Sequence, residues 1–415
     1  MTVIRRYLEQ ELEQALSEFG AVVIEGPKWC GKTFTAAQLC KSHVYFDIDV
    51  NARRLGTASP RMLLDGEYPR LFDEWQFAKE IWNQVRAQLN EPGFEGHYVL
   101  TGSAMAPIGD NVHTGTGRFH FLTMRTMSSV EANVSSGAIS LSALNSASTI
   151  GAKTTKLPLL AVFELICRGG WPALYGEPTK SSIKKVRSYV KAVVNRDLVE
   201  SNAGRNPALA TRVLKSLARN VSSEVKFSTI AKDVSGSAAP VKDETVSNYM
   251  SIFSRMMITE DLPAWNGHLR SSYALRTSPK RYFSDPSIAA ALLLATPENL
   301  LADLETAGLL FENLVMRDLR VYAQHADATV SHFRDASSLE VDAIIESYDG
   351  TWGAIEIKLS DHQVDVAAAS LLKFRDRVDT SKQTAPKFLA VVTNTEYSYT
   401  RPDGVHVISI TALGA

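Results

Sequence analysis

The feature that most constrains this chain is an eight-residue segment that matches the phosphate-binding pattern GxxxxGK[ST] at every position. This segment, the P-loop, consists of Gly26, Pro27, Lys28, Trp29, Cys30, Gly31, Lys32 and Thr33. The apolar run before it, residues 21–24, is typical of a buried strand, and the segment opens a predicted helix. Backbone N–H groups of such a loop and the N-terminus of the following helix attract phosphate groups. The sequence therefore predicts a nucleotide-binding α/β domain.

An acidic pair supplies the second element that nucleotide hydrolysis needs. Asp73 and Glu74 follow the apolar residues 71–72, at the end of a predicted strand. Lys32 is expected to contact the β- and γ-phosphates, while the Thr33 hydroxyl ligates Mg²⁺ and Asp73 holds the same ion through water. Glu74 is expected to polarise the attacking water. The predicted cofactors are thus ATP and Mg²⁺, and the alternative for the acidic pair is an ordinary solvated surface.

A third apolar strand, residues 98–100, ends in hydroxyl residues. Thr101 or Ser103 is positioned to sense the γ-phosphate, and the alternative here is an ordinary turn. Other short apolar runs alternate with helical patterns such as residues 78–89. Strands that alternate with helices indicate a parallel sheet covered on both faces.

Length and composition limit the class of protein. At roughly 150 residues per domain, the 415 residues suggest two or three domains. Hydrophobic residues make up 45% and charged residues 21%, which is typical of a globular chain. No apolar run approaches the roughly 18 residues of a membrane span, and no secretory signal is apparent. The three cysteines form no metal-binding pattern. We expect a cytoplasmic protein with no membrane partner.

Two features of the middle of the chain suggest contact with DNA. Residues 180–220, the basic belt, carry ten Lys/Arg against only Asp197 and Glu200, a local net charge of +8 in a chain whose net charge is −1. Such a surface is suited to a phosphate backbone, and the alternative is a solvated helical face. Residues 228–234 and 243–256 have the pattern of a helix-turn-helix unit, which binds either DNA or protein.

Composition shifts divide the chain into four expected regions. Residues 1–134 form the P-loop domain, and residues 135–157, rich in Ser, Ala, Gly and Thr, are the best linker candidate. Residues 158–270 form a helical and winged-helix-like region. Residues 271–415 return to strands and helices.

Three carboxylates that are far apart in the sequence and one lysine occur in an order that suggests a shared site: Glu312, Asp342, Glu356 and Lys358. Glu312 falls on a predicted helix and Asp342 on a strand, while Glu356 and Lys358 share one face of the next strand. This order resembles the PD-(D/E)xK nuclease core, which implies a second metal site where the carboxylates bind Mg²⁺ and the lysine steadies a hydroxide. The chain has Val341 where the motif's name has Pro. The alternative is a surface ion pair, and the resemblance leaves open whether the domain cuts DNA.

Short motifs over most of the chain form a wider pattern. They are GPKWCGKT, LFDEWQ, VLTGSA, Gly117-Arg118, TMSSVE, GGWP, NRDL, TVSNY, LPAW, FSDP and FEN. Together they resemble the prokaryotic AAA-type ATPases that carry a C-terminal domain of unknown function. The resemblance implies Walker roles for the P-loop and acidic pair and a sensor-like place for Ser103. It also implies that Arg118 completes a nucleotide site, in its own chain or in a neighbouring subunit.

The expected fold class is α/β, with an N-terminal AAA-type ATPase domain, a central helical or winged-helix region and a C-terminal restriction-endonuclease-like domain. The expected function is Mg²⁺-dependent ATP binding and hydrolysis coupled to nucleic-acid binding. One alternative is a nucleotide-switched regulator that binds DNA or protein and has a non-cutting nuclease-like domain. Another is a nuclease gated by ATP. A homo-oligomer or a protein partner fits any of these.

Overall fold

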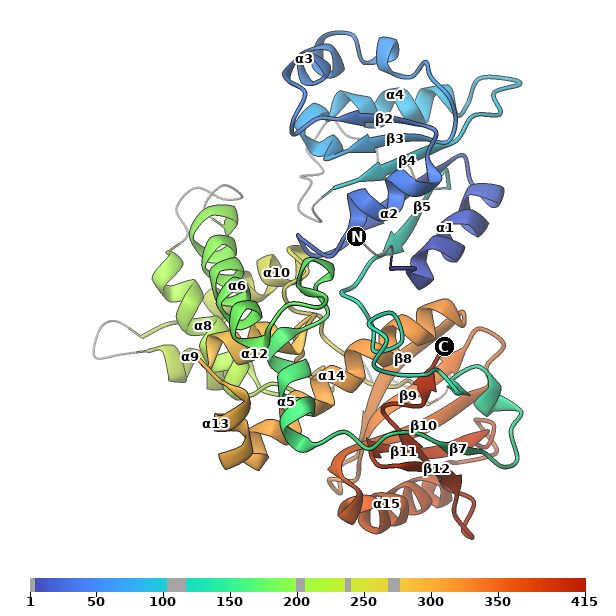
Figure 1. Cartoon of the computed structure of the whole chain (residues 1–415), viewed down its shortest axis with the longest axis vertical. Coiled ribbons are helices and arrows are strands. Elements are labelled where there is room, and N and C mark those ends of the chain that lie inside the picture. The colour runs from blue at the N-terminus through green and yellow to red at the C-terminus, as the bar shows by residue number, and fades with distance from the viewer. Residues whose placement is uncertain (1–3, 103–116, 199–205, 236–239, 268–276) are drawn as a thin grey trace. The chain divides into compact units, whose positions relative to one another are not determined.

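The computed structural model describes residues 4–102, 117–198, 206–235, 240–267 and 277–415 (Figure 1). The chain forms two compact units. The N-terminal unit consists of Met1–Thr126, Trp171–Ala173 and Arg255–Met257, and the C-terminal unit consists of Met127–Gly170, Leu174–Ser254 and Ile258–Ala415. Within the described residues, no helix combines the length and apolarity that crossing a bilayer requires.

The N-terminal unit is built on a five-stranded sheet with the order β2-β3-β4-β1-β5. The strands are β1 (Ala21–Glu25), β2 (Ser42–Tyr45), β3 (Arg70–Asp73), β4 (Tyr98–Thr101) and β5 (Phe119–Thr123). Every neighbouring pair is parallel. Parallel neighbours need crossover connections, and most of these contain helices. The parallel sheet expected from the sequence is confirmed.

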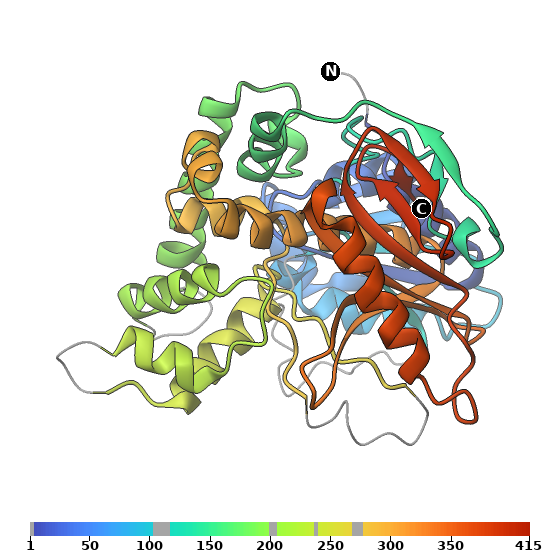
Figure 2. The same cartoon turned by 90° about the horizontal axis from the view of Figure 1, so that it is seen from below.

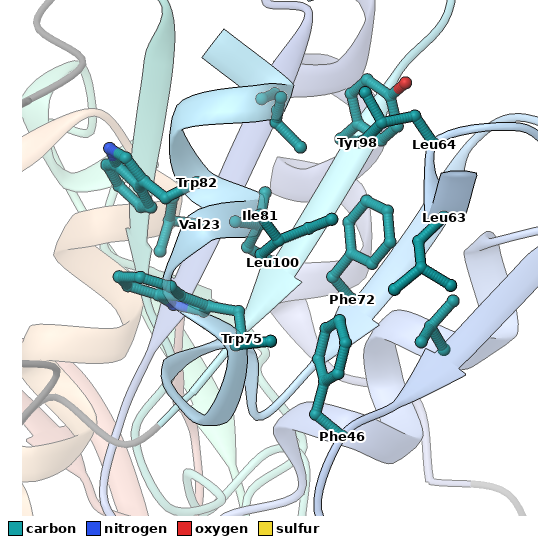
Figure 3. Packing of buried hydrophobic residues seen from close by; sticks show 14 of the residues in the cluster. Val23, Phe46, Leu63, Leu64, Phe72, Trp75, Ile81, Trp82, Tyr98 and Leu100 are labelled. Atoms are coloured by element: carbon teal, nitrogen blue, oxygen red, sulfur yellow. The ribbon is translucent and has the colours of Figure 1, made fainter. Parts of the chain in front are cut away.

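Helices cover both faces of this sheet. Successive side chains of β1 point to opposite faces, and each face has its own apolar core. The helices are α1 (Tyr7–Glu18), α2 (Lys32–Leu39), α3 (Val50–Ala58) and α4 (Glu80–Gln88), with single turns η1 (Pro60–Leu63) and η2 (Trp75–Ala78). Val22 and Ile24 pack in the core that contains the apolar side of α1. Val23 packs in the other core, with Trp82 of α4 and Phe72 of β3 (Figure 3). Each side chain buried in this way contributes about 1.5–3 kcal/mol.

The C-terminal unit contains a helical region. Its helices are α5 (Leu159–Arg168), α6 (Thr179–Ala192), α8 (Pro207–Arg219), α9 (Phe227–Val234), α10 (Asp243–Arg255), α12 (Pro286–Leu292), α13 (Pro297–Ala302) and α14 (Leu304–His325), and a π-helical turn (Val193–Asp197) continues α6. The helices α9 and α10 lie where the helix-turn-helix pattern predicted them. The winged-helix assignment stays a prediction.

A seven-stranded sheet with the order β7-β12-β13-β11-β10-β9-β8 forms the rest of this unit. The strands are β7 (Gly151–Lys153), β8 (Ala328–Arg334), β9 (Glu340–Ser347), β10 (Trp352–Ser360), β11 (Phe388–Asn394), β12 (Tyr397–Thr400) and β13 (His406–Ser409). The helix α15 (Val364–Arg377) lies along the sheet against β9, β10 and β11, as Figure 2 shows. The helix α14 packs on β8 and β10.

Residues 135–157, expected to be a linker, are instead part of the C-terminal unit. The strand β7 pairs with β12, and β6 (Ile139–Ser140) pairs with β14 (Leu413–Gly414). These strands have two and three residues, and β7 is largely exposed, so their sequence lacks the apolar alternation that marks a longer strand. Their partners lie more than 200 residues away in the chain, which no local pattern reveals.

Candidate nucleotide-binding site and C-terminal carboxylate cluster

The P-loop turns sharply between β1 and α2, and two glycines make this turn possible. At Gly26 an added Cβ would lie 2.2 Å from the carbonyl oxygen of Met124, so a larger residue requires the backbone to move. Gly31 caps α2 with a φ of +105°, in the left-handed region that glycine adopts without a steric penalty. Lys32 is the first residue of α2, so the loop leads directly into a helix N-terminus, as predicted.

The Lys32 side chain lies inside the curl of the P-loop. Its Nζ donates to the carbonyl oxygens of Gly26 at 2.9 Å and Pro27 at 3.0 Å. The residue is 6% exposed. The loop carbonyls therefore satisfy two of the three donors of the ammonium and hold the charge where the predicted phosphates would lie.

Asp73 is the acceptor for two hydroxyl groups at the end of β3. Thr33 Oγ1 donates to Asp73 Oδ1 at 2.7 Å, and Thr101 Oγ1 donates to the same oxygen. Burial raises the pKa of Asp73 above its ordinary value, and the hydrogen bonds from Thr101 and Thr33 offset part of that rise. The structure thus brings the predicted metal ligands together. Of the two candidate γ-phosphate sensors, Thr101 is bonded to Asp73 and Ser103 lies outside the described residues.

Glu74 follows β3 in a left-handed backbone conformation, with a φ of +52°. This conformation is uncommon for a residue other than glycine and often marks a functional site. Gln76 Nε2 donates a hydrogen bond to Glu74 Oε2. Burial raises the pKa of Glu74, and the bond from Gln76 opposes this rise. The carboxylate predicted to polarise water is therefore held by a side chain two residues further along the chain.

Two side chains that sequence reasoning missed contact the P-loop. Arg6 is 7% exposed, and its guanidinium donates to the carbonyl oxygens of Cys30 at 3.0 Å and Arg125 at 2.8 Å. Trp29 stacks on Trp171, with ring centroids 5.7 Å apart. An arginine before a helical pattern carries no local signal of a contact 24 residues away. Trp171 belongs to the GGWP motif, but nothing in the motif itself indicates a contact with the P-loop.

Arg118 lies at the opposite end of the sheet from the P-loop of its own chain. It immediately precedes β5, whose first residue, Phe119, pairs in parallel with Ala21 at the start of β1. The P-loop follows the end of β1, at Glu25. Arg118 is exposed, and its Nε donates to Asn90 Oδ1 at 2.6 Å. A role for Arg118 in the nucleotide site of its own chain is therefore wrong, because the length of a strand separates them.

The four C-terminal residues singled out in the sequence converge in the C-terminal unit. Glu312 comes from α14, Asp342 from β9, and Glu356 and Lys358 from β10. Lys358 Nζ lies 2.6 Å from Glu356 Oε2 and 3.2 Å from Asp342 Oδ2. The backbone N–H of Ile357 also donates to Asp342 Oδ2 at 2.9 Å. The side chains of the three carboxylates are 6–12% exposed, so the alternative of a surface ion pair is wrong.

A fifth residue, Lys280, completes this carboxylate cluster. Lys280 Nζ lies 2.8 Å from Asp342 Oδ1 and 3.2 Å from Glu312 Oε1. It also lies 3.6 Å from Glu340 Oε1. The hydroxyl of Tyr282 donates to Glu312 Oε1 at 2.5 Å. Lysine and carboxylate groups therefore alternate through the cluster.

Burial and neighbouring charges set the protonation of the cluster. Burial raises the pKa of Glu312 to about 7, and burial together with nearby Asp342 raises that of Glu356 to about 8. Burial also acts to raise the pKa of Asp342, but Lys280 and Lys358 outweigh it and hold that pKa well below its ordinary value. Asp342 is therefore ionised at neutral pH, between two ammonium groups.

The cluster does not have the form of a metal site. Hard cations such as Mg²⁺ need several oxygen ligands that are free to point at one centre. Here the inward oxygens of Asp342 accept hydrogen bonds from Lys280, Lys358 and a backbone N–H. In the described parts of the chain, no group of three His, Cys, Asp or Glu side chains has an arrangement that holds a metal ion.

The basic belt is only partly available to a ligand. Lys185 lies 3.0 Å from Glu177, and Arg187 Nη2 donates to the carbonyl oxygen of Leu294 at 3.0 Å. Lys184 and Lys191, on the same helix, are exposed. The belt is therefore a mixture of structural and solvated cations.

Three segments of the chain match known protein families. Residues 18–133 match the model of a family described as AAA domain. Residues 160–299 and 307–413 match two domains of unknown function, DUF8612 and DUF4143. Among solved structures, the Walker-type ATPase PABY2304 of Pyrococcus abyssi is similar at 13% identity, covering 70% of this chain and 96% of that chain with a TM-score of 0.45. No curated protein matches the chain.

The family match and the site geometry agree on the N-terminal unit. The matched residues contain the P-loop, Asp73 and Glu74. These residues lie on a parallel sheet that helices cover on both faces. Residues 18–133 are therefore similar to a AAA domain and contain a P-loop, and this similarity supports ATP binding and hydrolysis.

Proposed function

We propose that this protein binds ATP with Mg²⁺ and hydrolyses it at the P-loop. The observation that carries the proposal is the hydrogen bond from Thr33 to Asp73 beside the Lys32 ammonium. It joins the helix that follows the P-loop to the end of β3, and Glu74 is the next residue. The match of residues 18–133 to the AAA domain family supports the same chemistry.

The P-loop binds the phosphates through its backbone and through one ammonium. The N–H groups at the start of α2 are free of intrahelical partners and point toward a bound anion. Lys32 exchanges the carbonyl oxygens of Gly26 and Pro27 for phosphate oxygens. The exchange favours a nucleotide because a charge-assisted bond to an anion is stronger than a bond to a neutral carbonyl.

Thr33 and Asp73 fit the requirements of a Mg²⁺ site. A hydroxyl and a carboxylate are the hard oxygen ligands that Mg²⁺ prefers, and here they lie 2.7 Å apart. When bound, Mg²⁺ neutralises charge on the phosphate oxygens. Thr101 fixes the orientation of the Asp73 carboxylate from the neighbouring strand β4.

Glu74 is the general base that orients the attacking water. Its raised pKa moves it closer to neutrality, where a base accepts a proton most effectively. Its side chain is hydrogen-bonded to Gln76, so it must release that partner to reach a water at the γ-phosphate. Gln76 thereby controls when the base is available.

Arg118 serves the nucleotide site of a second subunit. The exposed guanidinium lies at the sheet end opposite its own P-loop, so only another chain can bring it to a γ-phosphate. A permanently charged, planar donor suits the charge that develops during phosphoryl transfer. Mixing Arg118→Ala chains with Lys32→Ala chains tests this role. Recovery of ATP turnover in the mixture is expected, and no recovery contradicts it.

ATP turnover measured as released phosphate tests the proposed function. Turnover is expected with Mg²⁺ and is expected to stop when EDTA removes the ion. Nucleotide binding is measured in parallel by fluorescence of a labelled ATP analogue. Tight binding without hydrolysis would instead favour a nucleotide-switched regulator, and absence of both would reject the assignment.

Coupling to nucleic acid is a second candidate, favoured by the exposed cations of the basic belt. Lys184 and Lys191 project from α6 without the protein contacts that occupy Lys185 and Arg187. Cations exposed on one helix attract a phosphate backbone without reading its sequence. ATP turnover measured with and without duplex and single-stranded DNA tests the coupling. Stimulation by either DNA supports it, and an unchanged rate together with no DNA binding favours a protein partner.

A further inference from the structure

We propose that Lys280 is the resident cation of the C-terminal carboxylate cluster and takes the place that a divalent metal ion would have in a nuclease-like core. The proposal concerns the C-terminal unit and does not depend on the ATPase assignment. Its consequence is that the cluster stabilises the fold and does not activate water against a phosphodiester.

The position of the Lys280 ammonium carries the proposal. Nζ lies within 3.2 Å of carboxylate oxygens from both α14 and β9, namely Glu312 Oε1 and Asp342 Oδ1. A metal ion shared by these carboxylates would need the same oxygens. Lys358 holds the other oxygen of Asp342. The carboxylate cluster therefore contains two ammonium groups and offers a metal ion no open carboxylate pair.

The backbone around Lys280 holds the side chain in place. The N–H of Lys280 donates to the carbonyl of Leu262 at 3.0 Å, and the N–H of Leu262 donates back to Lys280 at 2.8 Å. Two residues further on, the Tyr282 hydroxyl reaches the same Glu312 oxygen as Lys280 does. The Lys280 side chain is 3% exposed, so no solvated orientation is available without breaking this pairing.

Two ammonium groups already offset most of the negative charge of the three buried carboxylates without a metal ion. Three buried carboxylates, Glu312, Asp342 and Glu356, face the two lysines, and the partly exposed Glu340 adds a fourth contact to Lys280. Burial acts to lower the pKa of Lys280, but Asp342 and Glu312 outweigh it and raise that pKa well above its ordinary value. Lys280 is therefore charged at every physiological pH. A divalent ion added to this set would be repelled by two ammonium groups.

Removal of one partner from such a network is costly. A buried charge that loses its counterion strongly destabilises the folded state. Lys280 therefore fixes the segment after residue 277 to α14 and β9. Its truncation removes the ammonium from Asp342 Oδ1 and Glu312 Oε1, while the Tyr282 hydroxyl still donates to Glu312 Oε1. Two carboxylate oxygens that have lost a shared ammonium are suited to a divalent cation.

Mn²⁺ binding to the full-length protein without nucleotide tests the proposal, with free Mn²⁺ followed by electron paramagnetic resonance. The wild type is expected to bind no more Mn²⁺ than Asp342→Asn does. Lys280→Ala is expected to gain Mn²⁺ binding, and this gain is expected to disappear in the double variant with Asp342→Asn. Circular dichroism confirms that each variant is folded.

The wild-type measurement decides the question even if Lys280→Ala does not fold. Mn²⁺ binding by the wild type that Asp342→Asn removes would overturn the proposal, because Lys280 would then leave room for the metal. A folded Lys280→Ala variant that gains no Mn²⁺ would overturn it as well. Lys280→Arg is the matched control. It keeps the charge and is expected to bind as little Mn²⁺ as the wild type.

Discussion

Thr33 Oγ1 donates a 2.7 Å hydrogen bond to Asp73 Oδ1, although 40 residues separate them in the chain. The bond exists because β1 and β3 flank β4 in a parallel sheet, so that the carboxyl ends of the strands meet at one edge. Ligands of open α/β sheets bind at that edge. The pairing of the first turn of α2 with the end of β3 is therefore the geometric basis of the proposed ATPase site.

Replacement of Lys32 by alanine is expected to abolish ATP turnover and to destabilise the protein only moderately. The ammonium contacts two loop carbonyls, and hydrogen bonds of a charged group contribute about 1.5–3 kcal/mol each at most. Phosphate release and thermal unfolding are measured on the same preparation. Lys41→Ala, which removes an exposed cation outside the P-loop, is the control. Turnover at the wild-type rate in Lys32→Ala would reject the site.

Replacement of Glu74 by glutamine is expected to leave ATP binding intact and to slow hydrolysis by about 10²–10⁴-fold. Asp73 and Thr33 still hold Mg²⁺ in this variant, but the amide does not accept the proton of the attacking water. Single-turnover hydrolysis and binding of a labelled ATP analogue separate the two steps. A parallel loss of binding and hydrolysis would mean that Glu74 is a structural or metal-binding residue.

Replacement of Gln76 by alanine is expected to move the acidic limb of the pH–rate profile to higher pH. The hydrogen bond from Gln76 lowers the pKa of Glu74 against the effect of burial. Its removal raises that pKa, so more protons are bound at a given pH and activity is lost earlier as the pH falls. The profile of kcat is measured between about pH 5 and 8, where catalytic carboxylates with raised pKa values titrate. If the acidic limb does not move, a group other than Glu74 determines the pH at which activity is lost.

Replacement of Arg6 by alanine is expected to weaken ATP binding without changing the chemical step. Arg6 holds the carbonyl oxygens of Cys30 and Arg125, so its loss loosens the P-loop beneath the phosphates. The loss of two charge-assisted bonds predicts about a tenfold or larger rise in the Kd for ATP. The neighbouring Arg5 is exposed, and Arg5→Ala is the matched control. Equal effects of the two variants would contradict a specific role for Arg6.

Local patterns predicted the nucleotide site well because its chemistry is encoded in short segments. The P-loop and Asp73–Glu74 each follow an apolar strand, and both segments lie where the sequence placed them. The sequence left open whether Arg118 completes the site of its own chain or of a neighbouring subunit, because a motif fixes residue type but not the end of the sheet where the residue lies.

Contacts between distant segments were not predictable in the same way. Lys280 lies 62 residues from Asp342 in the chain. It belongs to no named helix or strand, so no periodic pattern in the sequence indicates that its side chain is buried. The spacing of Glu312, Asp342 and Glu356 correctly predicted that these carboxylates gather. It did not predict which cation neutralises them, because that depends on a backbone pairing between Leu262 and Lys280.

Charge reversal of Lys184 and Lys191 together is expected to reduce the salt dependence of DNA binding, if the basic belt meets a phosphate backbone. Each lost phosphate contact removes about 0.9 from the slope of log K against log salt. The reversal of Lys185 is the contrasting variant, since Lys185 is already paired with Glu177 at 3.0 Å. Because Glu177 already neutralises it, the Lys185 charge attracts a phosphate less strongly. Reversal of Lys185 is therefore expected to change the stability of the protein more than the slope of log K against log salt. Fluorescence anisotropy with a labelled duplex, measured from low to physiological salt, gives both slopes. Equal slopes for the wild type and the Lys184/Lys191 variant would identify the belt as a solvated helical face.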